Sequence, residues 1–100
     1  IDSLTEMFSE AAMVMLARAD IIAGRKNISS AFKFMKRHIS SIRNKALELS
    51  IYGLLAVEVG LYEHFDAQSN TIDSGKFLVV WQKIEGEWLI DKDSLNTNKR

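Results

Sequence analysis

The sequence predicts an α+β domain in which helices pack on the concave face of a strongly bent antiparallel sheet. The apolar residues between Arg25 and Ile39 recur every three or four positions, and from Ser41 onward the period changes to two. Several long strands in succession after a helix are typical of folds that keep their helices on one side of an antiparallel sheet. We expect one domain spanning residues 1–100, because a chain of 100 residues builds a single core.

The composition argues against several classes of protein. Thirteen basic and thirteen acidic residues cancel, so we expect neither a nucleic-acid partner nor a membrane partner. The chain has no cysteine, and its two histidines lack the paired spacing of a metal site, so we expect no metal and no other cofactor. We expect a cytoplasmic protein, although a leader removed before Ile1 would leave the same sequence.

The first third of the chain predicts two helices separated by a short hairpin. Ser3 and Glu6 form a capping-box pattern that indicates a helix start or a last helical turn. Residues 11–17 and 20–24 have the apolar character of short strands. Asn27 is the predicted N-cap of the second helix, and a boundary one to two residues earlier is the alternative. The apolar stripe of that helix is formed by Ile28, Ala31, Phe32, Met35 and Ile39.

The next segments alternate polar and apolar residues and predict two long strands, 43–52 and 55–65, joined by a turn at Gly53-Leu54. Gly60 interrupts the second strand, where a residue without a side chain usually marks a bend. Glu58, Tyr62 and His64 share one face of that strand, with Glu58 as a candidate base and Tyr62 as a candidate hydroxyl donor. An outer face covered in a dimer is the alternative environment for these side chains. Residues 66–75 are predicted to form a polar connection.

The hairpin over residues 75–93 closes at Glu85-Gly86 and allows two registers. A two-residue loop pairs Lys83 with Trp88, whereas a three-residue loop places Lys83 opposite Glu87. We favour the three-residue loop, because it forms a cross-strand charge pair and puts glycine at a left-handed position. In that register one face carries Phe77, Val79, Trp81, Leu89, Asp91, Asp93 and Leu95.

Three stretches resemble a known family. "GKFLVVWQKIEGEWLIDKDSLN" is similar to the C-terminal signature of SnoaL-like, nuclear-transport-factor-2-like domains, in particular their uncharacterised ketosteroid-isomerase-like branch. "GRKNISSAF" resembles the opening of the family's second helix, and "LAVEVGLYEHF" resembles one of its strands. The resemblance implies a cystatin-like cone that encloses a pocket, a homodimer formed through the outer face of the sheet, and a first helix that is largely missing here.

The resemblance also assigns individual positions. Phe77, Trp81 and Asp93 stand where the family has its strand aromatic residues and its hairpin aspartate. The general-base position of true ketosteroid isomerases falls near Met15, whose thioether cannot take up a proton. Leu95 replaces the aromatic residue that usually follows the aspartate.

Three functional hypotheses follow: a pocket that binds an apolar or aromatic small molecule, a cofactor-free isomerase, cyclase or hydrolase, and a non-catalytic dimerisation or interaction module. Burial beside aromatic rings disfavours the charged form of a carboxylate and makes it a candidate acid or base. A structural bond to a lysine or a turn amide is the alternative for each aspartate. The catalytic candidates are Asp93 and Glu58, and the ligand-binding candidates are Phe77, Trp81, Tyr62, Asp91, His64 and Met15.

Overall fold

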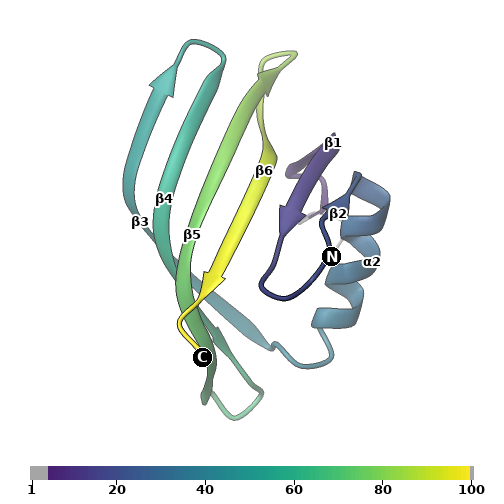
Figure 1. Cartoon of the computed structure of the whole chain (residues 1–100), viewed down its shortest axis with the longest axis vertical. Helices are drawn as coiled ribbons and strands as arrows, with labels where there is room; N and C mark the ends of the chain where they lie inside the picture. The colour runs from purple at the N-terminus through teal and green to yellow at the C-terminus, as the bar shows by residue number, and fades with distance from the viewer. Residues whose placement is uncertain (1–4, 100) are drawn as a thin grey trace.

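A six-stranded sheet and one helix make up the described part of the chain (Figure 1). The computed structural model describes residues 5–99, so the predicted first helix and its start at Ser3 fall outside the described residues. The strands lie in the order β2-β1-β6-β5-β4-β3. The elements are β1 (Phe8–Met15), β2 (Ile22–Ala23), α2 (Arg25–Met35), β3 (Ser41–Tyr52), β4 (Leu55–Phe65), β5 (Thr71–Ile84) and β6 (Glu87–Thr97).

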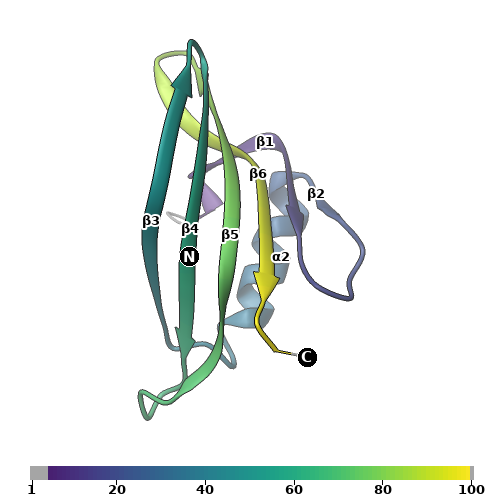
Figure 2. The same ribbon diagram turned by 60° about the vertical axis from the view of Figure 1, so that its left-hand side comes forward.

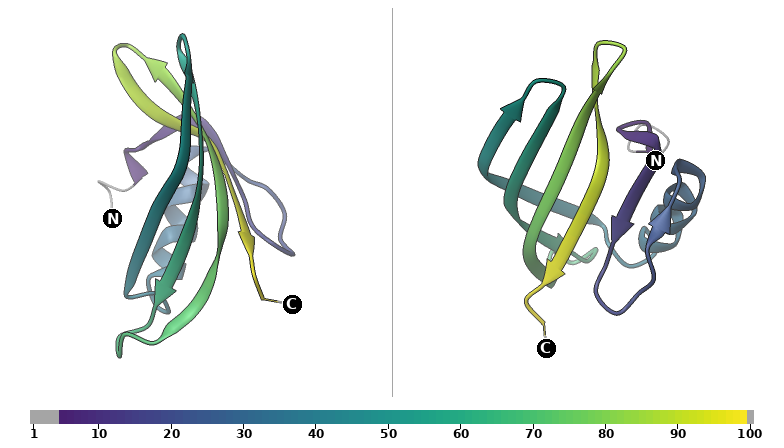
Figure 3. Two further views of the ribbon diagram at one scale, coloured as in Figure 1. Left: turned by 90° about the vertical axis from the view of Figure 1, so that its left-hand side faces the viewer. Right: turned by 45° about the horizontal axis from the view of Figure 1, so that its top comes forward.

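The sheet is bent, and α2 lies on the inside of the bend. Figures 2 and 3 show the long strands β3 to β6 as a curved layer, with α2 on its concave side next to β1 and β2. The predicted α+β architecture is therefore confirmed. The prediction of a wholly antiparallel sheet is wrong in one place, because β1 pairs with β6 in parallel, Val14 lying opposite Asp93. A hairpin cannot join these two strands, which stand at opposite ends of the chain.

Helix α2 directs its predicted apolar stripe toward the sheet: Ile28 is fully buried, and the other residues of the stripe are partly buried. The N-cap is Gly24, whose φ of 89° suits a residue without a side chain, so the predicted cap at Asn27 is wrong. The Asn27 amide instead donates a hydrogen bond of 2.9 Å to the Ala23 carbonyl. The helix ends at Met35, earlier than predicted, although the Ile39 amide still bonds to the Met35 carbonyl at 3.0 Å.

The predicted strands β3 and β4 are confirmed, together with the turn at Gly53 between them. At Gly60 a β-carbon would collide with the Phe77 ring, so glycine lets that ring lie flat against the backbone of β4. The predicted connection 66–75 is too long, because β5 already begins at Thr71. The loop before it is short because the Asp66 carboxylate accepts hydrogen bonds of 2.9 Å from two amides, those of Gln68 and Asn70.

The β5–β6 hairpin closes with a two-residue loop, so the favoured three-residue register is wrong. Both loop residues have positive φ, 49° at Glu85 and 83° at Gly86, as in the turn whose twist matches that of the flanking strands. Lys83 lies opposite Trp88, with its ammonium group 5.8 Å from the centre of the indole ring, and not opposite Glu87.

A β-bulge further along the hairpin changes which β6 side chains face inward. Val80 pairs with Lys92 and Trp81 pairs with Ile90, which leaves Asp91 as the extra residue. Ile90 therefore takes the inner position opposite Trp81 that we predicted for Leu89, and Asp93 takes the position opposite Val79 that we predicted for Asp91. The turn and the bulge together shift Asp93 by two positions, from Phe77 to Val79, and a shift of two keeps a side chain on the same face. The predicted inward direction of Asp93 is thus correct although the predicted register is not.

The core lies between α2 and the inner face of the sheet. Its buried apolar residues are Phe8, Ala12, Val14, Ile28, Tyr62, Phe77, Val79 and Ile90. The opposite side of the sheet exposes a patch that we call the outer-face patch, formed by Leu55, Val57, Val59, Leu61, Leu78 and Val80. Within residues 5–99, no helix has the length and apolar character needed to cross a membrane.

Candidate functional site

A cavity of about 460 Å³ lies between α2 and the inner face of the sheet. Most of its wall is apolar and comes from every layer of the fold. The main apolar contributors are Val14 and Leu16 near the end of β1, Ile28, Phe32 and Met35 on α2, and Phe77, Val79, Trp81, Ile90 and Leu95 on the hairpin. This size lies within the range of small-molecule sites, about 300–1,000 Å³.

Most of the predicted site residues meet in this cavity. Both catalytic candidates line it, as do four of the ligand-binding candidates, so the structure brings together Asp93, Glu58, Phe77, Trp81, Tyr62 and His64. Asp91 and Met15 do not line the cavity. Asp91 is the bulge residue, and its carboxylate accepts hydrogen bonds from the Ser9 hydroxyl at 3.1 Å and the Lys92 ammonium at 2.6 Å. Met15 alternates with its neighbours Val14 and Leu16, which do face the cavity.

One end of the cavity holds two carboxylates and an indole, which we call the acidic end. Glu58 on β4 and Asp93 on β6 both pair with Val79 on β5, so the two carboxylates flank the same central strand. The Trp81 indole N–H donates a hydrogen bond of 3.0 Å to Glu58 Oε1. Asp93 has no hydrogen-bond or salt-bridge partner among residues 5–99. Burial, followed by the nearby charge of Glu58, raises the pKa of Asp93 to about 6.

At the other end of the cavity, the wall residue Tyr62 belongs to a hydrogen-bond network with Asp73 and Thr97. We call this end the tyrosine end. The Tyr62 hydroxyl donates a bond of 3.0 Å to Asp73 Oδ2, and the Thr97 hydroxyl donates one of 2.6 Å to Asp73 Oδ1. Burial, together with the bond to Asp73 and its charge, raises the pKa of Tyr62 to about 12. The His64 ring lies 4.7 Å from the Tyr62 ring, and burial lowers the pKa of His64 below its ordinary 6.5, against the opposing charge of Asp73.

The network changes the role that we predicted for Tyr62. Because the Tyr62 hydroxyl donates its single proton to a hydrogen bond with Asp73, it has no second proton to donate to a ligand. The Tyr62 hydroxyl is thus a hydrogen-bond donor in this structure, but its donor is used within the fold. A group with a pKa of about 12 also keeps its proton throughout the neutral range.

Sequence reasoning missed Asp73 and Thr97, which complete the tyrosine end. Asp73 was placed in a polar connection, whereas it lies on β5 opposite His64. The alternation of β5 extended backward from Phe77 through Gly75 reaches Asp73 on the same face, and this signal was available in the sequence. Ile90 was also missed, because nothing in the sequence marks the bulge at Asp91.

The site can exchange a proton and hold an apolar molecule. A carboxyl group with a pKa of about 6 is populated in both protonation states near neutral pH, as a general acid or base requires. Within the described part of the chain, no group of three or more histidine, aspartate or glutamate side chains is arranged to hold a metal ion. His38 lies outside the cavity, at the end of α2, with its ring 5.8 Å from that of Phe34.

No family model and no curated protein matches the sequence. Solved structures do resemble the fold. A ketosteroid isomerase-like protein from Erwinia carotovora atroseptica matches with a TM-score of 0.83 at 9% identity, over 99% of this chain and 82% of the other. An NTF2-like protein with a cystatin-like fold from Novosphingobium aromaticivorans matches with a TM-score of 0.82 at 12% identity, over 97% and 68% of the two chains.

An NTF-2 like protein of unknown function from Shewanella oneidensis also matches, with a TM-score of 0.76 at 17% identity over 94% of this chain and 80% of the other. At such identities the likeness concerns the fold alone. The chain thus has the NTF2-like, cystatin-like fold that the resemblance implied. A shared fold does not determine activity, so the activity of this chain depends on its own cavity residues.

Proposed function

We propose that this chain is a small-molecule-binding domain whose ligand is an apolar or aromatic molecule held in the cavity. The observation that carries the proposal is an apolar chamber of about 460 Å³ with an unpartnered carboxyl group, Asp93, on its wall. Binding sites for small molecules combine a mostly apolar surface with a few polar groups that set the orientation of the ligand. In this reading Phe77 and Trp81 supply contact area, and Asp93 and Glu58 orient the ligand.

Fluorescence of Trp81 offers a direct test. The other tryptophan, Trp88, does not line the cavity, so Trp88→Phe leaves a chain whose emission reports on the site alone. We expect the neutral aromatic probe N-phenyl-1-naphthylamine to gain fluorescence and to quench Trp81 at micromolar concentration. Without saturable quenching the proposal fails.

A pair of variants on α2 distinguishes the cavity from the surface. Ala31 lines the cavity, whereas its neighbour Ser30 is exposed and does not. Ala31→Phe fills the chamber and should abolish probe binding, while Ser30→Phe adds the same ring outside and should leave binding unchanged. Equal effects of the two substitutions would place the probe elsewhere.

A second candidate function is a cofactor-free isomerase, cyclase or hydrolase that uses Asp93 or Glu58 as a general base. The pKa of Asp93, raised to about 6, favours this candidate, because bases work best when their pKa lies near the working pH. In such a step the carboxylate removes a proton beside a carbonyl group, and an enolate forms and is reprotonated.

Deuterium uptake by 2-tetralone in D₂O, followed by NMR, tests this step. The rate of uptake should be higher with the protein than in buffer, and Asp93→Asn should return it to the rate in buffer. A rate equal to that of buffer would refute catalysis of this step.

We also propose a homodimer formed through the outer-face patch. Leu55, Leu61 and Leu78 are 45%, 44% and 43% exposed on adjacent strands, an arrangement typical of a surface that a partner covers. Light scattering at micromolar concentration should give twice the mass of the chain, and Leu78→Lys should give a monomer. A monomeric unmodified chain would refute the dimer and, with it, the hypothesis of a self-associating interaction module.

A further inference from the structure

The hydrogen-bond donors and acceptors on the cavity wall differ in whether they are free to bind a ligand. Two donors on its wall are already used, because the Trp81 N–H is bonded to Glu58 and the Tyr62 O–H is bonded to Asp73. The carboxylate acceptors are free, since both Asp93 oxygens and Glu58 Oε2 have no donor among residues 5–99. The acidic end of the cavity therefore complements a molecule that donates hydrogen bonds.

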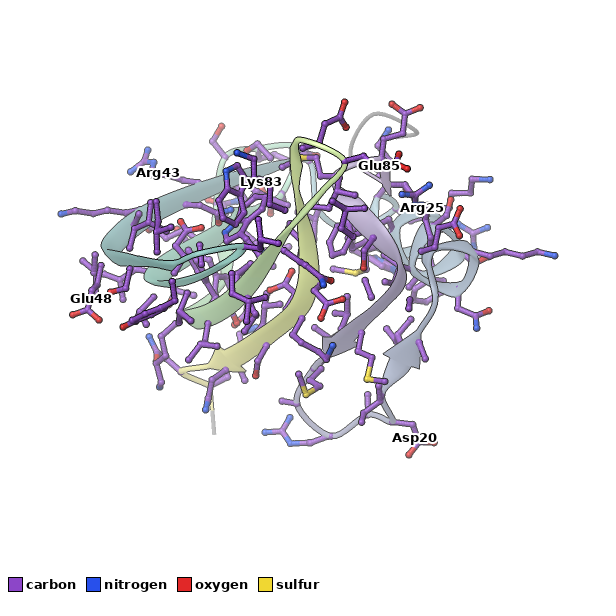
Figure 4. The ribbon with its side chains drawn as sticks, turned by 90° about the horizontal axis from the view of Figure 1, so that it is seen from above. Asp20, Arg25, Arg43, Glu48, Lys83 and Glu85 are labelled. Atoms are coloured by element: carbon purple, nitrogen blue, oxygen red, sulfur yellow. The ribbon has the colours of Figure 1, made fainter. Side chains whose placement is uncertain are left out.

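The distribution of charged side chains also favours a ligand that donates hydrogen bonds at the acidic end. No salt bridge in the described part of the chain joins Glu58 or Asp93 to a cation. His64 is held neutral by burial, and Lys36, at the rim after α2, is exposed. The remaining nearby cations are used or lie outside: Arg25 is bonded to the Phe8 carbonyl, and Lys92 to Asp91. Figure 4 shows Arg43 at the periphery, on β3, and Lys83 lies on the β5–β6 hairpin with its ammonium group 5.8 Å from the ring of Trp88, outside the cavity.

Two carboxylates without a countercharge beside an apolar chamber are energetically costly when both are ionised. A cationic group that enters the acidic end relieves this cost, because it neutralises Glu58 and Asp93 and supplies their missing hydrogen bonds. The Trp81 ring adjoins the same end, and an indole face attracts organic cations.

We propose that the cavity is selective for an organic cation, namely a primary or secondary amine on a compact apolar body, whose ammonium group is bound by Asp93 and Glu58. This inference rests on the proposed binding function and narrows its ligand class. The apolar wall formed by Phe32, Phe77 and Val79 takes the body of the ligand.

The test uses three probes of the same shape: adamantan-1-amine, adamantan-1-ol and adamantane-1-carboxylate. Isothermal titration calorimetry at neutral pH should show the amine binding about tenfold or more tightly than the alcohol, as a charge-assisted hydrogen bond predicts, and no detectable binding of the carboxylate. Binding of the alcohol measures the contribution of the apolar wall without the charge interaction. If the alcohol binds as tightly as the amine, the inference is wrong while the proposed binding function stands. If none of the three binds, the proposed function fails as well.

Two variants assign the selectivity to the acidic end. Asp93→Asn and Glu58→Gln keep the shape of each side chain and remove its charge, so each should lower the affinity for the amine by about tenfold and leave the alcohol unaffected. Glu63→Gln is the control, because Glu63 lies on the outer face of β4 and pairs with the exposed Arg43. A loss of amine and alcohol binding in equal measure would indicate a structural role and overturn the inference.

Discussion

A carboxylate lies near an aromatic side chain at each end of the cavity, Asp93 on the wall and Asp73 behind the wall residue Tyr62, yet the two differ in how the charge is satisfied. At the tyrosine end, Asp73 accepts hydrogen bonds from both Tyr62 and Thr97, one on each oxygen. At the acidic end, Asp93 has no such partner among residues 5–99 and faces a second carboxylate, Glu58. The ends are separated along β4 by four residues, Glu58 to Tyr62, or about 13 Å.

The difference distinguishes a structural carboxylate from a functional one. Hydrogen bonds that satisfy a carboxylate stabilise the fold, whereas burial without partners costs free energy when the group ionises. Proteins tolerate such a cost mainly where a ligand or a reaction uses the group. The comparison therefore assigns Asp73 to the fold and Asp93 to the site, and each assignment has measurable consequences.

The largest expected effect comes from replacing each aspartate by asparagine. At pH 8, Asp93→Asn should raise the free energy of unfolding by up to about 3 kcal/mol, because it removes a charge that the folded state disfavours. Asp73→Asn should lower the free energy of unfolding by about 1–3 kcal/mol, because one of the two hydroxyl bonds loses its acceptor. Denaturant unfolding of the two variants measures both values.

The effect at Asp93 also has a predicted pH dependence. Its folded-state pKa of about 6 is raised above the ordinary 3.8, so the folded protein binds this proton more tightly than the unfolded chain does. The resulting stability is complete below pH 3.8 and is lost as the pH rises through 6. The advantage of Asp93→Asn should therefore vanish in acid. Two substitutions that change stability in the same direction at pH 8 would erase the distinction between the ends.

A smaller effect is expected for Tyr62→Phe, which removes one donor from Asp73 and keeps the ring. We expect a loss of about 1.5 kcal/mol in the free energy of unfolding, the low end for a bond to a charged group. Tyr52, which is 67% exposed on β3, is the matched control, and Tyr52→Phe should cost nothing measurable. If Tyr62→Phe is as silent as its control, the tyrosine end has no structural role.

The smallest effect concerns how Glu58 acts on Asp93. Burial is the larger cause of the raised pKa of Asp93, and the charge of Glu58 is the second. Glu58→Gln should therefore lower the pKa of Asp93 and leave it above 3.8. Titration of the carboxyl resonance by NMR measures the shift. A complete return to the ordinary value would mean that repulsion, and not burial, controls the acidic end.

The sequence predicted the fold better than the details of the site. Periodicity identified α2, β3 and β4, because each presents one apolar face over many residues. The bulge at Asp91 could not be predicted, since it arises from how β6 pairs with two neighbours at once, β5 and, in parallel, β1. Long-range pairing of this kind leaves no local signal along the chain.

The candidate residues show the same limit. Glu58, Tyr62 and His64 were placed together correctly because they alternate along one strand. The direction of the hydrogen bond from Tyr62 depends on Asp73, a residue of another strand that was placed in a loop. Patterns within a strand predict which side chains share a face, whereas the partners that decide their chemistry come from other strands.

The central claim is that Asp93 is a half-buried carboxyl group on the wall of a ligand cavity, without a hydrogen-bond partner among residues 5–99, and its titration tests this most directly. The side-chain ¹³C resonance of Asp93, assigned by its absence from Asp93→Asn, should titrate with a midpoint of about 6 in the unliganded protein. A midpoint near 3.8, the ordinary value of an aspartate, would contradict the account.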